Sequence, residues 1–300
     1  MFALALAKSM ATNGRYVLDG GLSWKERAFL SFLLQRTKDK RRLKRYFSGK
    51  QSRRVLGHFA RNLFLLSLRT KCSLDVLDDN LLIGLNDRGE NYRFLLAAVP
   101  RPDVPFFHGM TPFVDIFVRR IYDPFDYKGG TVIDVGGYVG DTAVYFALNG
   151  AREVYSFEPN PVSFRYMLRN LELNGVSDRV RASNSAVSRD RTKYVVPDKA
   201  GAGSLHTTRR GSASYDVETV DPEGLLKDMP NIALLKVDCK GCEMELFQYG
   251  LSDVAMKAKH IIVDSGRLDP EQRSRVVSNL KSAGFLFREG PPTVLYFQKA

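Results

Sequence analysis

The sequence predicts a doubly wound α/β sheet that follows a basic, mostly helical N-terminal region. Three observations support this prediction. Short apolar segments alternate with helix-like segments from residue 131 onward. The first of these segments runs into a glycine-rich turn and then a helix, as in nucleotide-binding α/β sheets. The chain has 300 residues, 44% of them hydrophobic, which is enough to bury a core.

Residues 1–108 are expected to form the N-terminal region. Ser23 is placed to cap a first helix, and residues 55–68 read as a second, apolar helix. Residues 74–96 alternate in polarity and contain turn-forming Asp and Asn residues, which predicts a small sheet or hairpin. Three prolines between residues 100 and 105 then break regular structure and indicate a linker.

The charge of the chain is concentrated in residues 36–71. This basic block holds thirteen Lys or Arg residues and one acid, Asp39, so its net charge of +12 equals that of the whole chain. Such a block predicts contact with an anionic partner, which is a nucleic acid, an anionic membrane or an acidic glycan. A solvated, charge-rich helix surface is the alternative interpretation.

Residues 109–300 are expected to form the α/β domain. Apolar runs predict strands at 131–135, 153–157, 180–187, 232–238 and 260–264, and helices are predicted at 142–148, 162–173, 241–249 and 270–283. Two further apolar segments, 285–287 and 293–297, can turn back on each other at Gly290-Pro-Pro and close the chain as a hairpin.

The turn after the first of these strands predicts a nucleotide site. Gly136, Gly137 and Gly140 let the backbone approach a ligand closely, because no side chain intervenes. The following helix offers unpaired N–H groups to a carboxylate or phosphate. Glu158 ends the next strand, where a carboxylate can accept both hydroxyl groups of a ribose.

Two cofactors fit this site, a nicotinamide dinucleotide and S-adenosylmethionine. The glycines occur as G-G-x-x-G, whereas a dinucleotide site has G-x-G-x-x-G. Asp134 lies inside the strand just before the loop, and Asp141 follows it. These carboxylates would repel a pyrophosphate but attract the ammonium group of S-adenosylmethionine. The sequence therefore favours S-adenosylmethionine.

The same residues resemble the FkbM-type methyltransferases over residues 112–298. The shared segments are 132–142, 155–161, 184–187, 204–205, 217–221 and 234–243. The last segment is the most specific, since the family pattern there is Lys-x-Asp-x-Glu-Gly-x-Glu. Lys236, Asp238, Gly241 and Glu243 keep that pattern, and Lys240 replaces the usual Glu, which reverses a charge beside the expected active site.

This resemblance implies a Rossmann-like methyltransferase sheet of about seven strands, with the last strand antiparallel. It also implies O-methylation, often of a sugar or polyketide hydroxyl, with S-adenosylmethionine as the methyl donor. Together, the loop and the resemblance predict cofactor contacts from Asp134, Gly136, Gly137, Tyr138, Gly140, Asp141, Thr142, Glu158, Asn184 and Ala186.

Asp238 is the expected catalytic base. It lies at the carboxyl end of the fourth strand, an edge that faces the ligand crevice beside the first strand. A hydroxyl nucleophile loses its proton during methyl transfer, and a carboxylate at this position can take it. Lys236 is expected to pair with Asp238, two residues away on the same strand face. Glu243 is expected either to hold the substrate or to stabilise a helix N-terminus.

The cysteines and histidines are expected to be structural. Cys72, Cys239 and Cys242 are an odd number at low density, which argues against a disulfide framework and for a reducing compartment. The four histidines lack metal-ligand spacing, so no metal site is expected. No apolar run reaches 18 residues, so no membrane-spanning helix is expected. We expect a cytoplasmic location, with a peripheral position at the inner membrane face as the alternative.

The leading functional hypothesis is methylation of a hydroxyl on a sugar, glycan or small metabolite. The second hypothesis is an RNA-directed methyltransferase that holds phosphates with the basic block. The third is a non-catalytic adaptor for nucleic acid or membrane that kept the fold. The presence of Asp134, Glu158 and Asp238 together argues against the third.

Overall fold

The computed structural model describes most of the chain after residue 52. The described residues are Trp24 and residues 53–77, 80–97, 110–188, 194–197, 214–221, 231–239, 242–248, 257–291 and 293–300. The chain divides into two compact units, residues 1–119 and 120–300, whereas the sequence placed the boundary after residue 108. The first expected helix apart from Trp24, residues 36–52 of the basic block and the proline linker lie outside the described residues.

The first unit contains a three-stranded antiparallel sheet and two helices. Its elements are α4 (Arg53–Ser67), β1 (Lys71–Leu77), β2 (Asn80–Asp87), β3 (Glu90–Ala97) and α5 (Met110–Phe117). Arg88 and Gly89 have φ angles of 50° and 94°, as a two-residue turn between β2 and β3 requires. Phe113 of α5 packs on Phe94 of β3 with ring centroids 4.8 Å apart. The second expected helix and the hairpin are confirmed, but the described part of this unit is as much sheet as helix.

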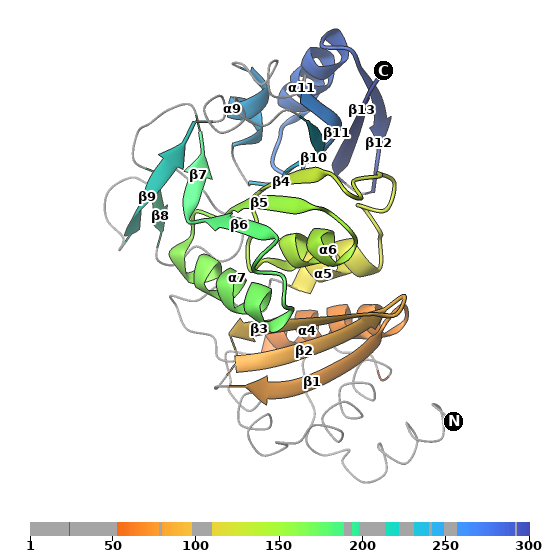
Figure 1. The fold of residues 1–300 in the computed structure, drawn as a ribbon, viewed down its shortest axis with the longest axis vertical. Coiled ribbons are helices and arrows are strands. Elements are labelled where there is room, and N and C mark those ends of the chain that lie inside the picture. The colour runs from red at the N-terminus through yellow and green to blue at the C-terminus, as the bar shows by residue number, and fades with distance from the viewer. Residues whose placement is uncertain are drawn as a thin grey trace. The chain divides into compact units, whose positions relative to one another are not determined.

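The second unit is built on a seven-stranded sheet in the order β12-β13-β11-β10-β4-β5-β6 (Figure 1). The strands are β4 (Thr131–Val135), β5 (Glu153–Phe157), β6 (Val180–Ser183), β10 (Ile232–Val237), β11 (Ala258–Asp264), β12 (Phe285–Glu289) and β13 (Val294–Lys299). The five strands from β11 to β6 are parallel, and β13 is antiparallel to both of its neighbours. The predicted sheet with an antiparallel last strand is therefore confirmed.

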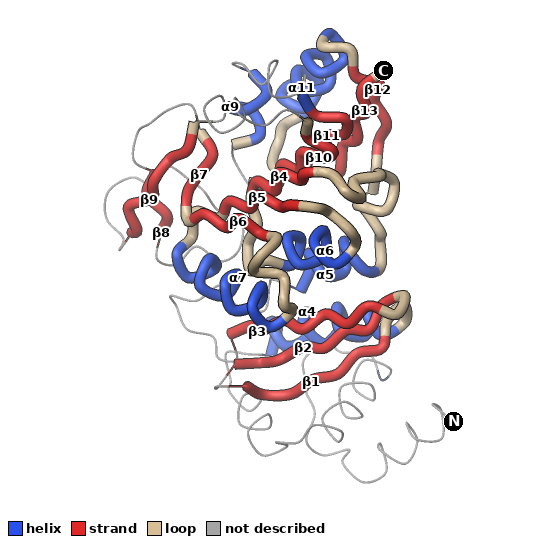
Figure 2. Tube along the Cα trace, in the orientation of Figure 1, coloured by secondary structure: helices blue, strands red, loops and turns tan. Residues whose placement is uncertain are grey.

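Helices cover both faces of this sheet (Figures 1 and 2). One face carries α6 (Asp141–Leu148) and α7 (Pro161–Leu173), and the other carries α9 (Glu243–Gln248) and α11 (Pro270–Ser282). After β4 the chain continues to β5 on one side, and it returns on the other side as β10. The carboxyl ends of β4 and β10 therefore form the switch point where ligands bind in open α/β sheets. Among helices within the described residues, none is long and apolar enough to span a membrane.

A second, three-stranded sheet adjoins the end of β6. It consists of β7 (Ser185–Val187), β9 (Ser214–Val220) and β8 (Tyr194–Pro197), in that order. The sequence predicted one strand over residues 180–187, which is wrong, because the segment breaks at Asn184 and contributes to two sheets. The Asn184 side chain donates to the carbonyls of Glu158 and Pro159, and these bonds hold the break in place.

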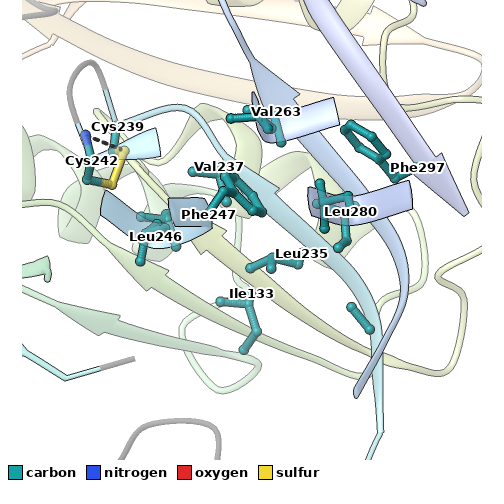
Figure 3. Packing of buried hydrophobic residues seen from close by; sticks show 14 of the residues in the cluster. Ile133, Leu235, Val237, Cys239, Cys242, Leu246, Phe247, Val263, Leu280 and Phe297 are labelled. Atoms are coloured by element: carbon teal, nitrogen blue, oxygen red, sulfur yellow. Dashed lines mark hydrogen bonds between the residues drawn. A yellow bond between two sulfur atoms is a disulfide. The ribbon is translucent and has the colours of Figure 1, made fainter. Parts of the chain in front are cut away.

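The buried core of the second unit lies along its central strands (Figure 3). Ile133, Leu235, Val237 and Val263 are inward-facing residues of β4, β10 and β11, and none is more than 3% exposed. Such continuous burial is expected for parallel strands covered on both faces. It gives the carboxyl ends of these strands a rigid base.

Candidate functional site

An ion pair between Asp134 and Lys236 lies at the centre of the candidate site. β4 and β10 are parallel neighbours, and their register places Lys236 beside Asp134. Lys236 Nζ donates to Asp134 Oδ1 at 2.6 Å and to the carbonyl of Gly136 at 2.8 Å. Sequence spacing predicted Asp238 as the partner of Lys236. The ion pair is instead with Asp134, because the pairing between strands decides which side chains meet.

The second oxygen of Asp134 is also engaged within the protein. Thr142 Oγ1 and Ser156 Oγ donate to Asp134 Oδ2 at 2.8 and 2.9 Å, and the aspartate is 0% exposed. Asp134 therefore ties β4, β5, β10 and α6 together, and a ligand ammonium group can sense its charge only indirectly. Ser156 was missed by the sequence analysis. The available signal was a lone serine inside the apolar strand Glu153–Phe157.

The glycines of the loop allow close packing against the rest of the protein. Gly136 has a φ of 88°, and a Cβ there would lie 2.0 Å from the carbonyl oxygen of Asp238. Gly140 has a φ of 81°, and its Cβ would meet Met167 of α7. A side chain at either position would both strain the backbone and clash. These glycines let the loop pack against the residues after β10 and against α7. Glycine is therefore required here for internal packing, in addition to the expected close approach to a ligand.

Glu158 lies where β5 ends and faces the loop. Its Oε2 accepts the backbone N–H of Tyr138 and its Oε1 accepts that of Asn160, both at 2.8 Å. Burial raises the pKa of Glu158 to about 8, although these two hydrogen bonds and Lys236 act in the opposite direction. Each carboxylate oxygen can accept more than one hydrogen bond, so Glu158 keeps the capacity to bind a ribose diol.

Two further side chains, those of Asn184 and Asn170, hold the loops around Glu158. Asn184 Nδ2 donates to the Glu158 carbonyl at 2.8 Å, so the expected cofactor residue Asn184 also fixes this turn. Ala186 is buried in β7 and contributes packing. Asn170 of α7, which the sequence analysis missed, donates to the carbonyl of Val139 at 2.8 Å and is fully buried. The sequence signal for Asn170 is a polar residue on the inner face of a predicted helix.

Asp141 is the first residue of α6 and is buried. Its Oδ1 atom makes no hydrogen bond within the described part of the protein. Burial raises the pKa of Asp141 to about 7; Lys236 opposes this increase, and Asp134 and Asp238 add to it. Among the described residues, Lys236 is therefore surrounded by more carboxyl groups than one lysine can pair with.

Asp238 follows β10 directly and is partly exposed. Its backbone N–H donates to the Val135 carbonyl at 3.0 Å, which fixes it beside the glycine loop. Glu243 begins α9, is 1% exposed, and accepts the Cys239 N–H through Oε1 at 3.1 Å. This contact gives Glu243 a role that neither expectation named, which is to hold the turn after β10 in shape. Asp238 is therefore the better placed of the two to reach a substrate.

Cys239 and Cys242 form a disulfide in the same turn (Figure 3). Their Cα atoms are 5.6 Å apart, within the usual range for a disulfide. The sequence argued against a disulfide framework and did not predict this link, because a count of cysteines does not detect a local bond at the end of a strand. Both residues are buried in the hydrophobic cluster. Among the described residues, no three His, Cys, Asp or Glu side chains gather as a metal site would require.

The buried carboxyls predict a stability that falls as the pH rises from about 5 to about 8. Glu158 and Asp141 have pKa values raised to about 8 and about 7, so the folded protein retains protons that the unfolded chain has lost. Each retained proton lowers the free energy of unfolding by about 1.4 kcal/mol per pH unit. Urea unfolding at several pH values measures this slope, and Asp141→Asn should make it shallower. Identical slopes in both proteins would contradict this account.

The sequence of the chain is similar to those of known methyltransferases. The model of the methyltransferase FkbM domain matches residues 134–287. "Methyltransferase 1" of Beauveria bassiana is 26% identical over an alignment of length 165 that covers 46% of this chain and 66% of that protein. A ribosomal protein L11 methyltransferase of Citrifermentans bemidjiense is 40% identical over 67 residues, which are 21% of this chain and 22% of that protein.

The chain is also similar to solved structures, at low sequence identity. A METTL16 methyltransferase domain is 13% identical, with a TM-score of 0.42, over 82% of this chain and 81% of that one. The chain spans less than two thirds of the length of both curated relatives above.

Proposed function

The chain belongs to the FkbM methyltransferase family, and from this premise we propose that it transfers the methyl group of S-adenosylmethionine to a hydroxyl of a sugar, glycan or small metabolite. The observation that carries the proposal is Glu158. Its carboxylate is held beside the glycine loop by two backbone N–H groups, at the position where a ribose diol is bound in this kind of sheet.

The charges of the site support a cationic donor. Lys236 interacts with the carboxyl groups of Asp134, Asp141, Glu158 and Asp238, so the described charged groups around it are mostly acidic. Such a surrounding favours a ligand with a positive charge and disfavours a pyrophosphate. Glu158 would hold the ribose, and the loop and the start of α6 would hold the amino-acid part. When bound, S-adenosylmethionine supplies an electrophilic methyl group.

The residues of the chain align the acceptor with that methyl group. Alignment alone can contribute roughly 7–11 kcal/mol toward lowering the barrier of such a displacement. Asp238, at the carboxyl end of β10, would orient the acceptor hydroxyl and take its proton as the methyl group is transferred. The hydrogen bond from the Asp238 N–H to the Val135 carbonyl anchors the backbone of Asp238 beside the loop.

Binding measurements with Glu158→Gln test the proposal. The wild-type protein should bind both S-adenosylmethionine and S-adenosylhomocysteine in calorimetry, and NAD should not compete. The variant should bind both ligands at least about tenfold more weakly, since it loses an acceptor for the shared ribose, and a tenfold change corresponds to about 1.4 kcal/mol. Tight NAD binding without any response to S-adenosylmethionine would refute the proposal.

An RNA acceptor is the second candidate, and the basic block is the observation that favours it. A charge of +12 within residues 36–71 is suited to phosphate contacts. Binding to RNA that weakens steeply as salt is added would favour this acceptor over a neutral sugar. Methyl transfer to neither class, with intact donor binding, would instead favour a non-catalytic adaptor.

A further inference from the structure

We propose that Asp141 is the residue that distinguishes the methyl donor from its demethylated product, by providing a buried negative charge that only the donor compensates. The inference rests on the proposed donor, S-adenosylmethionine. It assigns to Asp141 a selectivity that goes beyond simple contact with the cofactor.

The two ligands differ in one charge. S-adenosylmethionine has a sulfonium, an ammonium and a carboxylate group, so its net charge is +1. S-adenosylhomocysteine has a neutral thioether in place of the sulfonium, and its net charge is zero. Their adenosine and amino-acid parts are otherwise the same. A site that separates them must therefore respond to the charge or to the methyl group itself.

The position of Asp141 makes it sensitive to that charge. It starts α6 immediately after the loop, is 2% exposed, and its Oδ1 has no hydrogen-bond partner among the described residues. A buried carboxyl oxygen without a partner is unfavourable, and a ligand that brings a positive charge relieves this cost.

The charged neighbours of Asp141 compensate its negative charge only in part. They are Lys236 on β10, Asp134 on β4 and Asp238 after β10. The cation among them, Lys236, already donates to Asp134 at 2.6 Å and to a backbone carbonyl at 2.8 Å. The two aspartates repel a negative charge on Asp141 and, with burial, raise its pKa to about 7. At neutral pH, part of the ligand-free protein therefore holds a proton on Asp141.

Donor binding should displace that proton, whereas product binding should leave it largely in place. A positive ligand favours the ionised carboxylate, and a neutral one does not. After methyl transfer the site has lost its compensating charge, and Asp141 can take up a proton again. This proton exchange lowers the affinity for the product relative to the affinity for the donor. Faster release of the product would then increase the rate of turnover.

Titration of Asp141→Asn with each ligand tests the inference. The variant should bind S-adenosylmethionine at least about tenfold more weakly, but S-adenosylhomocysteine within about threefold of the wild type. Glu158→Gln is the matched control, because it should weaken both ligands to the same extent. Calorimetry in two buffers of different ionisation enthalpy should also show that donor binding releases more protons than product binding in the wild type. That difference should shrink in Asp141→Asn.

The pH dependence of ligand binding tests the inference on the wild-type protein alone, so the test does not depend on whether a variant folds. The ratio of the product and donor dissociation constants should increase between pH 6 and 8, as Asp141 ionises. Glu158 titrates in the same range, but the ribose it binds is common to both ligands, so its effect cancels in the ratio. A ratio that does not change with pH, or equal weakening of both ligands by Asp141→Asn, would overturn the inference while leaving the donor assignment intact. Failure of the wild type to bind either ligand would overturn both.

Discussion

Lys236→Met is expected to lower the free energy of unfolding by about 3–5 kcal/mol, the usual cost of removing one partner of a buried ion pair. Lys236 is 2% exposed and donates to Asp134 at 2.6 Å. Methionine matches the length of the aliphatic chain but brings no charge. Asp134 would then remain buried beside the carboxyls of Asp141 and Asp238, with no cation to offset them. Urea unfolding of the purified variant measures the loss.

Two control variants isolate the charge from the packing. The double variant Asp134→Asn, Lys236→Met should be more stable than Lys236→Met alone, because it removes the charge that the single variant leaves uncompensated. Arg275→Met breaks an exposed ion pair with Glu271 on α11 and should change stability by less than about 1 kcal/mol. A single variant that is as stable as the wild type would show that the buried pair contributes little.

The sequence predicted the positions of the strands of the seven-stranded sheet well, because local patterns determine them. Buried parallel strands are short apolar runs, and the runs that contain Ile133, Leu235 and Ile261 were each recognised. The end of α7 was also predicted from Asn174-Gly175, and Gly175 has the positive φ of 63° that such a helix end favours. These signals need no knowledge of distant contacts.

The partners of the polar residues were harder to predict, because strand pairing creates them. Lys236 and Asp134 are 102 positions apart in the sequence, and only the register between β10 and β4 brings them together. Ser156 on β5 likewise meets Asp134 through the register between β5 and β4. The break at Asn184 depends on carbonyl groups of residues 158 and 159, which lie more than 20 positions upstream. A single sequence holds no direct record of such pairs.

Asp238→Asn should slow methyl transfer by at least about 100-fold, at the lower end of what the loss of a general base costs. Asparagine has nearly the same shape but cannot take the acceptor proton at neutral pH. Asp238 is partly exposed at the end of β10, although its Oδ1 atom is buried, whereas Asp134 is fully buried and paired. Of these two carboxylates, Asp238 is therefore the better placed to meet an acceptor. The rate is measured as transfer of labelled methyl to the acceptor, with saturating donor.

Donor binding and stability distinguish catalysis from a structural role for Asp238. If Asp238 acts on the acceptor, Asp238→Asn should keep its melting temperature and its affinity for S-adenosylhomocysteine while turnover falls. Asp264→Asn is the matched control, because Asp264 lies at the same end of the neighbouring strand β11, where it accepts hydrogen bonds from Thr293 and Gly266. That change should affect stability more than turnover. A lowered melting temperature with near-normal turnover in Asp238→Asn would instead mean that Asp238 holds the turn beside Gly136, and that another group accepts the proton.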